Sequence, residues 1–133
     1  MAAALKAGKV AMHELQISRH RVHNVEVIEL AGAIDALGFT ELSTTLTRTI
    51  EDATPCIALN CLQVSYIGSA QLRALINLAA LARTAGGDIK CVGLAPTIRQ
   101  IVNLIAGNDP LEFYDEMSAV HVAFHEMSMS LAR

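Results

Sequence analysis

The sequence predicts an α/β domain with a single mixed β-sheet of four to five strands and about four α-helices. Apolar runs of strand length alternate with segments whose apolar residues recur at helical spacing. Such alternation favours parallel strands joined by right-handed helical crossovers. A polar break in the first apolar stretch predicts a hairpin, which adds an antiparallel strand at one edge. The 133 residues suffice for one domain with its own core.

The composition predicts an aliphatic core and argues against nucleic acid as a partner. Hydrophobic residues make up 53% of the chain, aromatic residues make up 4%, and tryptophan is absent. The net charge is −3 and the ten lysines and arginines are scattered, so neither a basic patch nor a base-stacking surface is expected. No segment reaches the roughly 18 consecutive apolar residues of a membrane span, so no membrane insertion is predicted. Cys56, Cys61 and Cys91 lie in apolar runs and are expected to be buried thiols of a cytoplasmic protein.

The domain is expected to span residues 13–127. Residues 1–12 are interpreted as a flexible leader, because their apolar part is too short for a secretory signal. An alternative interpretation takes Met12 as the natural start. Residues 128–133 are expected to form a frayed tail.

The first elements are predicted to be a hairpin followed by a helix. The hairpin strands are expected at His13–His20 and Val25–Leu30, and the turn between them at Arg21–Asn24. Gly32 is expected to break the second strand. Asp35 stands just before a helix that is predicted over residues 39–51, with core positions at Leu42, Leu46 and Ile50.

A buried strand and a helix are predicted around the middle of the chain. The strand covers Cys56–Leu62, and the helix covers Ser69–Ala85 and ends at two glycines. The helix is expected to bury the stripe Leu72, Leu75, Ile76, Ala79 and Ala82. Its opposite face carries small or mixed residues, namely Ala70, Arg73, Ala74, Asn77 and Leu81. Such a face leaves room for a protein partner, although alanine is also simply a good helix former.

The remaining chain continues the alternation. We predict a strand over Asp88–Leu94, a helix that begins with Pro96 in its first turn, a short strand over Leu111–Tyr114 and a closing helix over Met117–Met127. The buried stripe of the third helix is expected at Ile98, Ile101, Val102 and Ile105.

Ser69 is the main candidate for a functional residue, because it lies where a buried strand is followed by a helix. A serine there can cap the helix through its side chain. The free N–H groups and the positive dipole end of a helix also accommodate an anion. Ser69 could therefore carry a phosphate without unfolding the domain.

Catalysis and metal binding have little support in the sequence. The run Ile67–Gln71 lacks both glycines of the hydrolase motif Gly-x-Ser-x-Gly. His121 and His125 share a helix face, but no third ligand can be named. His20 and His23 are expected to be solvated turn residues. No glycine-rich phosphate loop precedes a helix. We therefore predict neither enzyme activity nor a metal or other cofactor.

The order of elements and four segments resemble the STAS domain, the fold of bacterial anti-sigma factor antagonists. The segments are Gly32–Asp35, Ile57–Leu62, Val64–Leu72 and Ala85–Pro96. The resemblance covers about Glu14 to Phe124. It implies that Ser69 is phosphorylated by a switch-type serine kinase that is also the anti-sigma factor, and that phosphorylation ejects the protein from this partner.

The surface that the resemblance implies for partner binding surrounds this serine. It consists of Asp35, Gly68, Ser69, Ala70, Arg73, Ala74 and Asn77. Gly68 and Gln71 stand where the family usually has aspartate and glycine. These changes are compatible with an alternative, in which the chain is an unphosphorylated STAS adaptor subunit of a transporter or lipid-trafficking complex. Whether the protein is a homodimer stays open.

Overall fold

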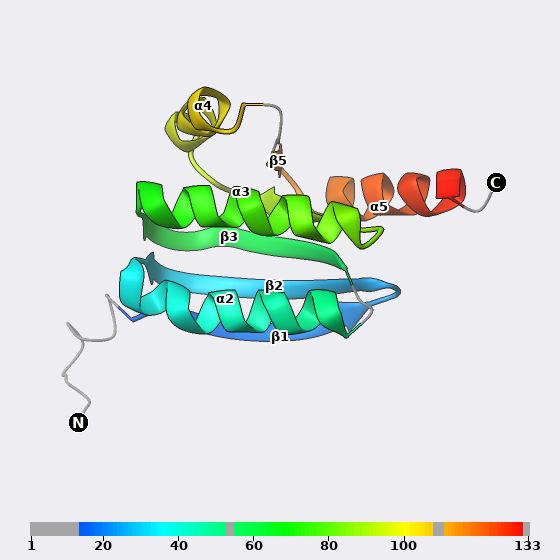
Figure 1. Cartoon of the computed structure of the whole chain (residues 1–133), viewed down its shortest axis with the longest axis horizontal. Helices are drawn as coiled ribbons and strands as arrows, with labels where there is room; N and C mark the ends of the chain where they lie inside the picture. The colour runs from blue at the N-terminus through cyan, green and yellow to red at the C-terminus, as the bar shows by residue number, and fades with distance from the viewer. Residues whose placement is uncertain (1–13, 53–54, 108–110, 132–133) are drawn as a thin grey trace.

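The computed structural model describes residues 14–52, 55–107 and 111–131. They form one five-stranded sheet with the strand order β1-β2-β3-β4-β5 (Figure 1). The elements in chain order are β1 (Gln16–Val22), β2 (Val25–Ile34), α2 (Ala36–Glu51), β3 (Cys56–Ile67), α3 (Ser69–Thr84), β4 (Asp88–Val92), α4 (Pro96–Ile105), β5 (Glu112–Tyr114) and α5 (Met117–Leu131). The predicted fold class, a single mixed sheet with four helices, is confirmed.

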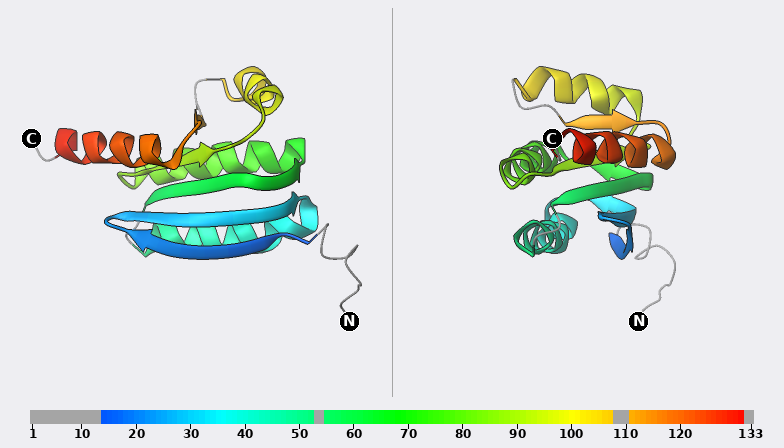
Figure 2. Two further views of the ribbon diagram at one scale, coloured as in Figure 1. Left: turned by 180° about the vertical axis from the view of Figure 1, so that it is seen from behind. Right: turned by 90° about the vertical axis from the view of Figure 1, so that its right-hand side faces the viewer.

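The sheet is covered on both faces. β1 pairs antiparallel with β2, whereas β2, β3, β4 and β5 run parallel to one another. Strand side chains alternate between two core clusters, one packed against α2, α3 and α4 and the other against α5. Figure 2 shows α2 and α3 side by side along one face. Because β2 and β3 are parallel, their carboxyl ends lie together, and Ile34 pairs with Ile67 there.

The helical core stripes are largely as the sequence predicts. All three predicted core positions of α2 and all five of α3 are buried. The predicted stripe of α4 is wrong at Ile101, which is 39% exposed, and only Val102 of α4 is fully buried. α5 continues to Leu131, beyond the predicted end at Met127.

Several predicted ends are wrong by two or three residues: β1 continues to Val22, β4 ends at Val92, and α2 begins at Ala36. The ends of β2 and β3 are wrong by more. β2 does not stop at Gly32 but continues to Ile34, with register shifts against β3 on either side of the glycine. Gly32 has a φ of 110°, and a Cβ there would lie 2.1 Å from the carbonyl oxygen of Glu14, so the glycine permits a close backbone approach within the strand. β3 likewise runs on to Ile67 rather than ending at Leu62.

The cysteines are free thiols, and Cys61 and Cys91 are buried as predicted, whereas Cys56 is only half-buried. A hydrogen bond with Cys61, together with burial, raises the pKa of the Cys91 thiol well above its ordinary value. In the described ranges, no helix is long and apolar enough to cross a membrane. The predicted leader falls in residues 1–13, which lie outside the described residues.

Candidate functional site

Ser69 lies at the carboxyl edge of the sheet, where β3 gives way to α3. Ile67 is the last strand residue, and Gly68 follows as the N-cap of α3 in an extended conformation with φ −76° and ψ 153°. The Gly68 amide donates a hydrogen bond to the carbonyl oxygen of Ile34, with 3.1 Å between the two atoms. This bond fixes the start of α3 beside the end of β2, and Ser69 is the first helical residue, with an exposed side chain.

The amino end of α3 carries no compensating side chain. Its N-cap makes no side-chain hydrogen bond, and its first turn contains no acidic residue. The expectation that Ser69 could cap the helix is therefore wrong, because the cap position belongs to Gly68. The first N–H groups of a helix lack partners within the helix, and the dipole makes this end positive. The end of α3 is thus electrostatically suited to a negative charge on Ser69.

Asp35 lies at the neighbouring strand end. Its carboxylate accepts a hydrogen bond from the Gly38 amide at 2.8 Å and so caps α2. Two apolar side chains at the same edge are exposed, Leu37 at 85% and Tyr66 at 57%. Neither was singled out from the sequence, since an isolated apolar residue near a turn gives no signal of exposure. Exposed apolar groups together at one edge are typical of a protein-binding surface.

The outer face of α3 extends this edge. Ala70, Arg73 and Asn77 are exposed, and Ala74 is half-buried. Gly68 is the one predicted partner-binding residue that is buried. The predicted surface is therefore continuous along α3, with Asp35 beside its amino end.

Gly68 and Gln71 are coupled by sterics. A Cβ on Gly68 would lie 2.0 Å from Oε1 of Gln71 and 3.4 Å from the Tyr66 hydroxyl oxygen. The Gln71 amide thus occupies the space into which a side chain at position 68 would project. An aspartate at position 68 requires Gln71 to swing away, which a flexible side chain can do.

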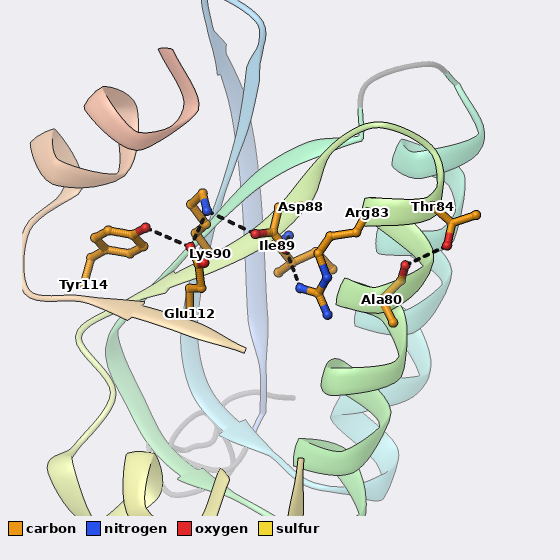
Figure 3. A network of polar contacts seen from close by, with 8 residues as sticks. All are labelled: Ala80, Arg83, Thr84, Asp88, Ile89, Lys90, Glu112 and Tyr114. Atoms are coloured by element: carbon orange, nitrogen blue, oxygen red, sulfur yellow. Dashed lines mark hydrogen bonds and ion pairs between the residues drawn. The ribbon is translucent and has the colours of Figure 1, made fainter. Parts of the chain in front are cut away.

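A second polar cluster lies on β4 and β5, and the sequence did not reveal it (Figure 3). Lys90 is 4% exposed, and its Nζ forms ion pairs with Asp88, at 3.0 Å, and with Glu112. Asp88 also accepts from Arg83 of α3 at 2.8 Å, and the Tyr114 hydroxyl donates to Glu112 at 2.8 Å. The cluster ties α3 to the two last strands.

The charges of this cluster stabilise one another. Burial by itself would lower the pKa of Lys90, but its hydrogen bonds to Glu112 and Asp88 raise it above the ordinary value. Burial by itself would raise the pKa of Glu112, but hydrogen bonds from Lys90 and Tyr114 lower it. The Lys90 ammonium also lies 5.1 Å from the ring centroid of Phe124 in α5. Both pKa shifts favour the charged forms of Lys90 and Glu112, which suits a structural ion pair.

Within the described residues, no group of three or more potential metal ligands comes together. His121 and His125 lie on α5, which packs against the other face of the sheet. The geometry therefore offers these histidines no route to the Ser69 hydroxyl.

Comparisons with known proteins support this fold. Residues 17–112 match the sequence model of a family described as Mlab, STAS domain. No curated protein matches the chain. Among solved structures, an anti-sigma factor antagonist from Mycobacterium paratuberculosis is similar, with 17% identity and a TM-score of 0.68 over 84% of this chain and 95% of that one.

Two further structures show the same likeness. A Thermotoga maritima protein described as an anti-sigma factor antagonist has 14% identity and a TM-score of 0.73, over 82% of this chain and 94% of that one. The Bacillus cell fate determinant SpoIIAA in its phosphorylated form has 16% identity and a TM-score of 0.63, over 82% of this chain and 98% of that one. At such identities the structures establish the fold alone.

Proposed function

The chain belongs to the family of STAS domains described as Mlab, STAS domain, and on that premise we propose that it is a non-catalytic regulator of the anti-sigma factor antagonist type. Its partner is a switch-type serine kinase that also acts as an anti-sigma factor. The unphosphorylated protein binds this kinase, and phosphorylation of Ser69 releases it.

The observation that carries this proposal is the exposed hydroxyl of Ser69 at an uncompensated helix end. A phosphate adds about −1.5 to −2 charges, which the positive end of α3 can accommodate in the free protein. The exposed Leu37 and Tyr66 lie at the same edge of the sheet. A partner packed over these apolar groups would have to bury the phosphate, and that cost favours dissociation.

A second candidate function uses the same surface without phosphorylation. The Gln71 side chain fills the space beside Gly68, where the family usually has an aspartate. This arrangement favours an adaptor subunit of a transporter or lipid-trafficking complex. The two candidates differ in whether Ser69 is ever modified and in whether the partner is a kinase.

The direct test is incubation of the full chain with ATP and a switch-type serine kinase from the same organism, followed by mass spectrometry. Phosphate on Ser69 of the wild-type protein, absent from Ser69→Ala, supports the regulator. If no such kinase modifies Ser69, and a transporter ATPase binds the chain with micromolar or better affinity, the adaptor is the function. Whether the protein forms a homodimer is a separate question. The molar mass of the isolated chain, measured by analytical ultracentrifugation, answers it.

Ser69→Ala should leave the free energy of unfolding within about 0.5 kcal/mol of the wild type, because the hydroxyl makes no capping bond. Ser69→Asp should keep the fold and gain about 0.3–1 kcal/mol from the helix dipole. Urea denaturation measures both values.

On the proposed function, Ser69→Asp weakens kinase binding by about tenfold or more while Ser69→Ala does not. Equal affinities of the two variants would contradict the switch.

Gly68→Asp combined with Gln71→Gly should raise the initial rate of Ser69 phosphorylation by about tenfold, since it restores a carboxylate and removes the side chain in its way. Gly68→Asp alone should give a smaller increase, because Gln71 must first be displaced. The rate of phosphate incorporation from labelled ATP measures this. Thr84→Asp is the matched control, since it adds the same charge at an exposed position at the other end of α3, outside the predicted partner-binding surface. An equal rate in the control would show that added charge, rather than its position, matters.

A further inference from the structure

The helix α5 is buried on one side and exposed on the other. Val120 and Phe124 belong to the core cluster on this face of the sheet, and Met127 packs against that cluster. On the opposite side of the helix, Val122 is 57% exposed and Met129 is 58% exposed. In the left view of Figure 2 the later turns of α5 extend past the end of the sheet. The outer side of α5 therefore presents two large apolar side chains to its surroundings.

The exposed side of α2 is different. After its first turn, α2 exposes only polar residues, among them Glu41, Arg48 and Glu51. In α5, Glu126 is the single charged residue. A helix side that faces water normally carries charged and polar residues. The outer side of α5 is therefore typical of a helix that contacts protein on both sides.

Four exposed residues form what we call the outer strip of α5, namely Val122, His125, Glu126 and Met129. Because successive residues are about 100° apart around a helix, Val122 and Met129 lie within about 20° of each other. His125 lies about 60° to one side of Val122, and Glu126 lies about 40° to the other side. The outer strip thus has an apolar centre, a histidine along one edge and a carboxylate along the other.

The two polar residues of the outer strip have no partners within the part of the chain that the structure describes. Neither side chain forms a hydrogen bond or an ion pair there. Adjacent residues of a helix do not face each other, so His125 and Glu126 cannot pair within one α5. Each is available to an oppositely charged or hydrogen-bonding group of another molecule.

From these features we infer that a second copy of the chain packs on the outer strip, with the two α5 helices parallel and related by a two-fold axis along them. This symmetry places Val122 against the partner's Val122, and Met129 against the partner's Met129. It also turns the His125 edge of each helix toward the carboxylate edge of the other. His125 therefore meets the partner's Glu126, and the contact occurs twice.

Charge complementarity favours this arrangement over an antiparallel one. An antiparallel pair would bring Glu126 against the partner's Glu126 and His125 against the partner's His125. Like groups that face each other across an interface oppose association. In the parallel pair the outer strip is complementary to itself, both in its apolar centre and along its two edges.

The contact is small and lies apart from Ser69. The 15 residues of α5 span about 22 Å, and one helix offers less than the roughly 800 Å² per partner of a standard interface. We therefore expect a weak dimer, with a Kd on the order of 100 μM. The helices α2 and α3 pack on the other face of the sheet, so the surface around Ser69 stays open in both copies. The inference does not depend on the proposed switch.

Sedimentation equilibrium of the full chain, from about 10 μM to about 1 mM, tests the dimer. The molar mass should rise with concentration toward that of two chains. Val122→Glu should raise the Kd at least about fivefold, because it buries a carboxylate in the apolar centre. Leu104→Glu is the matched control and should leave the Kd unchanged, since Leu104 is 84% exposed on α4, which packs on the other face. A chain that stays monomeric at 1 mM, or an equal loss in both variants, would overturn the inference.

Two substitutions of His125 test the charge pairing. His125→Glu should raise the Kd about fivefold or more, because two carboxylates would meet. His125→Lys should lower it about twofold or more, because a full positive charge would meet the partner's Glu126. In an antiparallel dimer His125→Lys would weaken association instead, and that result would contradict the proposed pairing. Circular dichroism spectra check that each variant keeps its fold.

Disulfide trapping tests the orientation directly. Met129→Cys should form a covalent dimer under mild oxidation, because equivalent residues of a parallel pair lie within reach of a disulfide. Leu104→Cys, at another exposed position, and the wild type, which keeps its own three cysteines, should stay monomeric on a non-reducing gel. A covalent dimer that forms only when Met129→Cys is mixed with Val122→Cys would mean an antiparallel pair and would overturn the inference.

Discussion

Replacement of Asp88 with alanine is expected to lower the free energy of unfolding by about 3–5 kcal/mol. Asp88 is 3% exposed and accepts from Arg83 at 2.8 Å, from Lys90 at 3.0 Å and from the Ile89 amide at 2.8 Å. Without this carboxylate, Lys90 keeps a buried charge with Glu112 as its remaining ion-pair partner. Equilibrium unfolding in urea measures the change.

The contrasting variant is Asp115→Ala. Asp115 lies 2.7 Å from Arg99, a distance shorter than that of the Arg83–Asp88 pair, but its side chain is 87% exposed. Water and salt screen this pair, so its loss should cost less than about 1 kcal/mol. If the two variants lost similar amounts of stability, burial would not be what makes the Asp88 cluster important. Asp88→Asn should fall between them, because the amide can still accept from the Ile89 backbone.

The Asp88 cluster also shows where sequence reasoning fails. A charged residue at a strand end is normally solvated, and the pattern around Asp88 and Lys90 gives no sign that both are buried. Their partners Arg83 and Glu112 come from other elements, so the pairing depends on the tertiary fold.

The helix α3 shows the opposite case. Its buried stripe is predicted residue by residue, because one continuous apolar face meets the sheet along its whole length. α4 has a similar apolar spacing, but Ile101 is partly exposed and Leu104 is exposed. Periodicity indicates which residues share a face, and it does not tell how much of that face the rest of the protein covers.

The position of Ser69 was predictable, and its local contacts were not. A buried strand followed by an amphipathic helix places this serine at the junction on sequence grounds alone. The strand itself was predicted too short, because only Cys56–Asn60 pairs with β4 while the later residues pair with β2 alone. Ser65 and Tyr66 in that later part are exposed, and their pattern does not resemble a buried strand.

Replacement of Gly87 with alanine is the second change with a large expected effect, a loss of about 3 kcal/mol in the free energy of unfolding. A Cβ at Gly87 would lie 2.2 Å from the carbonyl oxygen and 2.4 Å from the carbonyl carbon of Pro55. These are backbone atoms, which cannot rotate away as a side chain can. The same carbonyl oxygen accepts from the Asp88 amide at 2.9 Å, so relief of the clash would also weaken the start of β4.

Gly86→Ala separates this clash from the conformational freedom of glycine. Gly86 has a φ of 97°, and a Cβ there would have nothing within 4 Å, so its replacement should cost only about 1–2 kcal/mol of backbone strain. Thermal or urea unfolding of both variants makes the comparison. A loss in Gly87→Ala no greater than in Gly86→Ala would mean that β3 and β4 can move apart at this end.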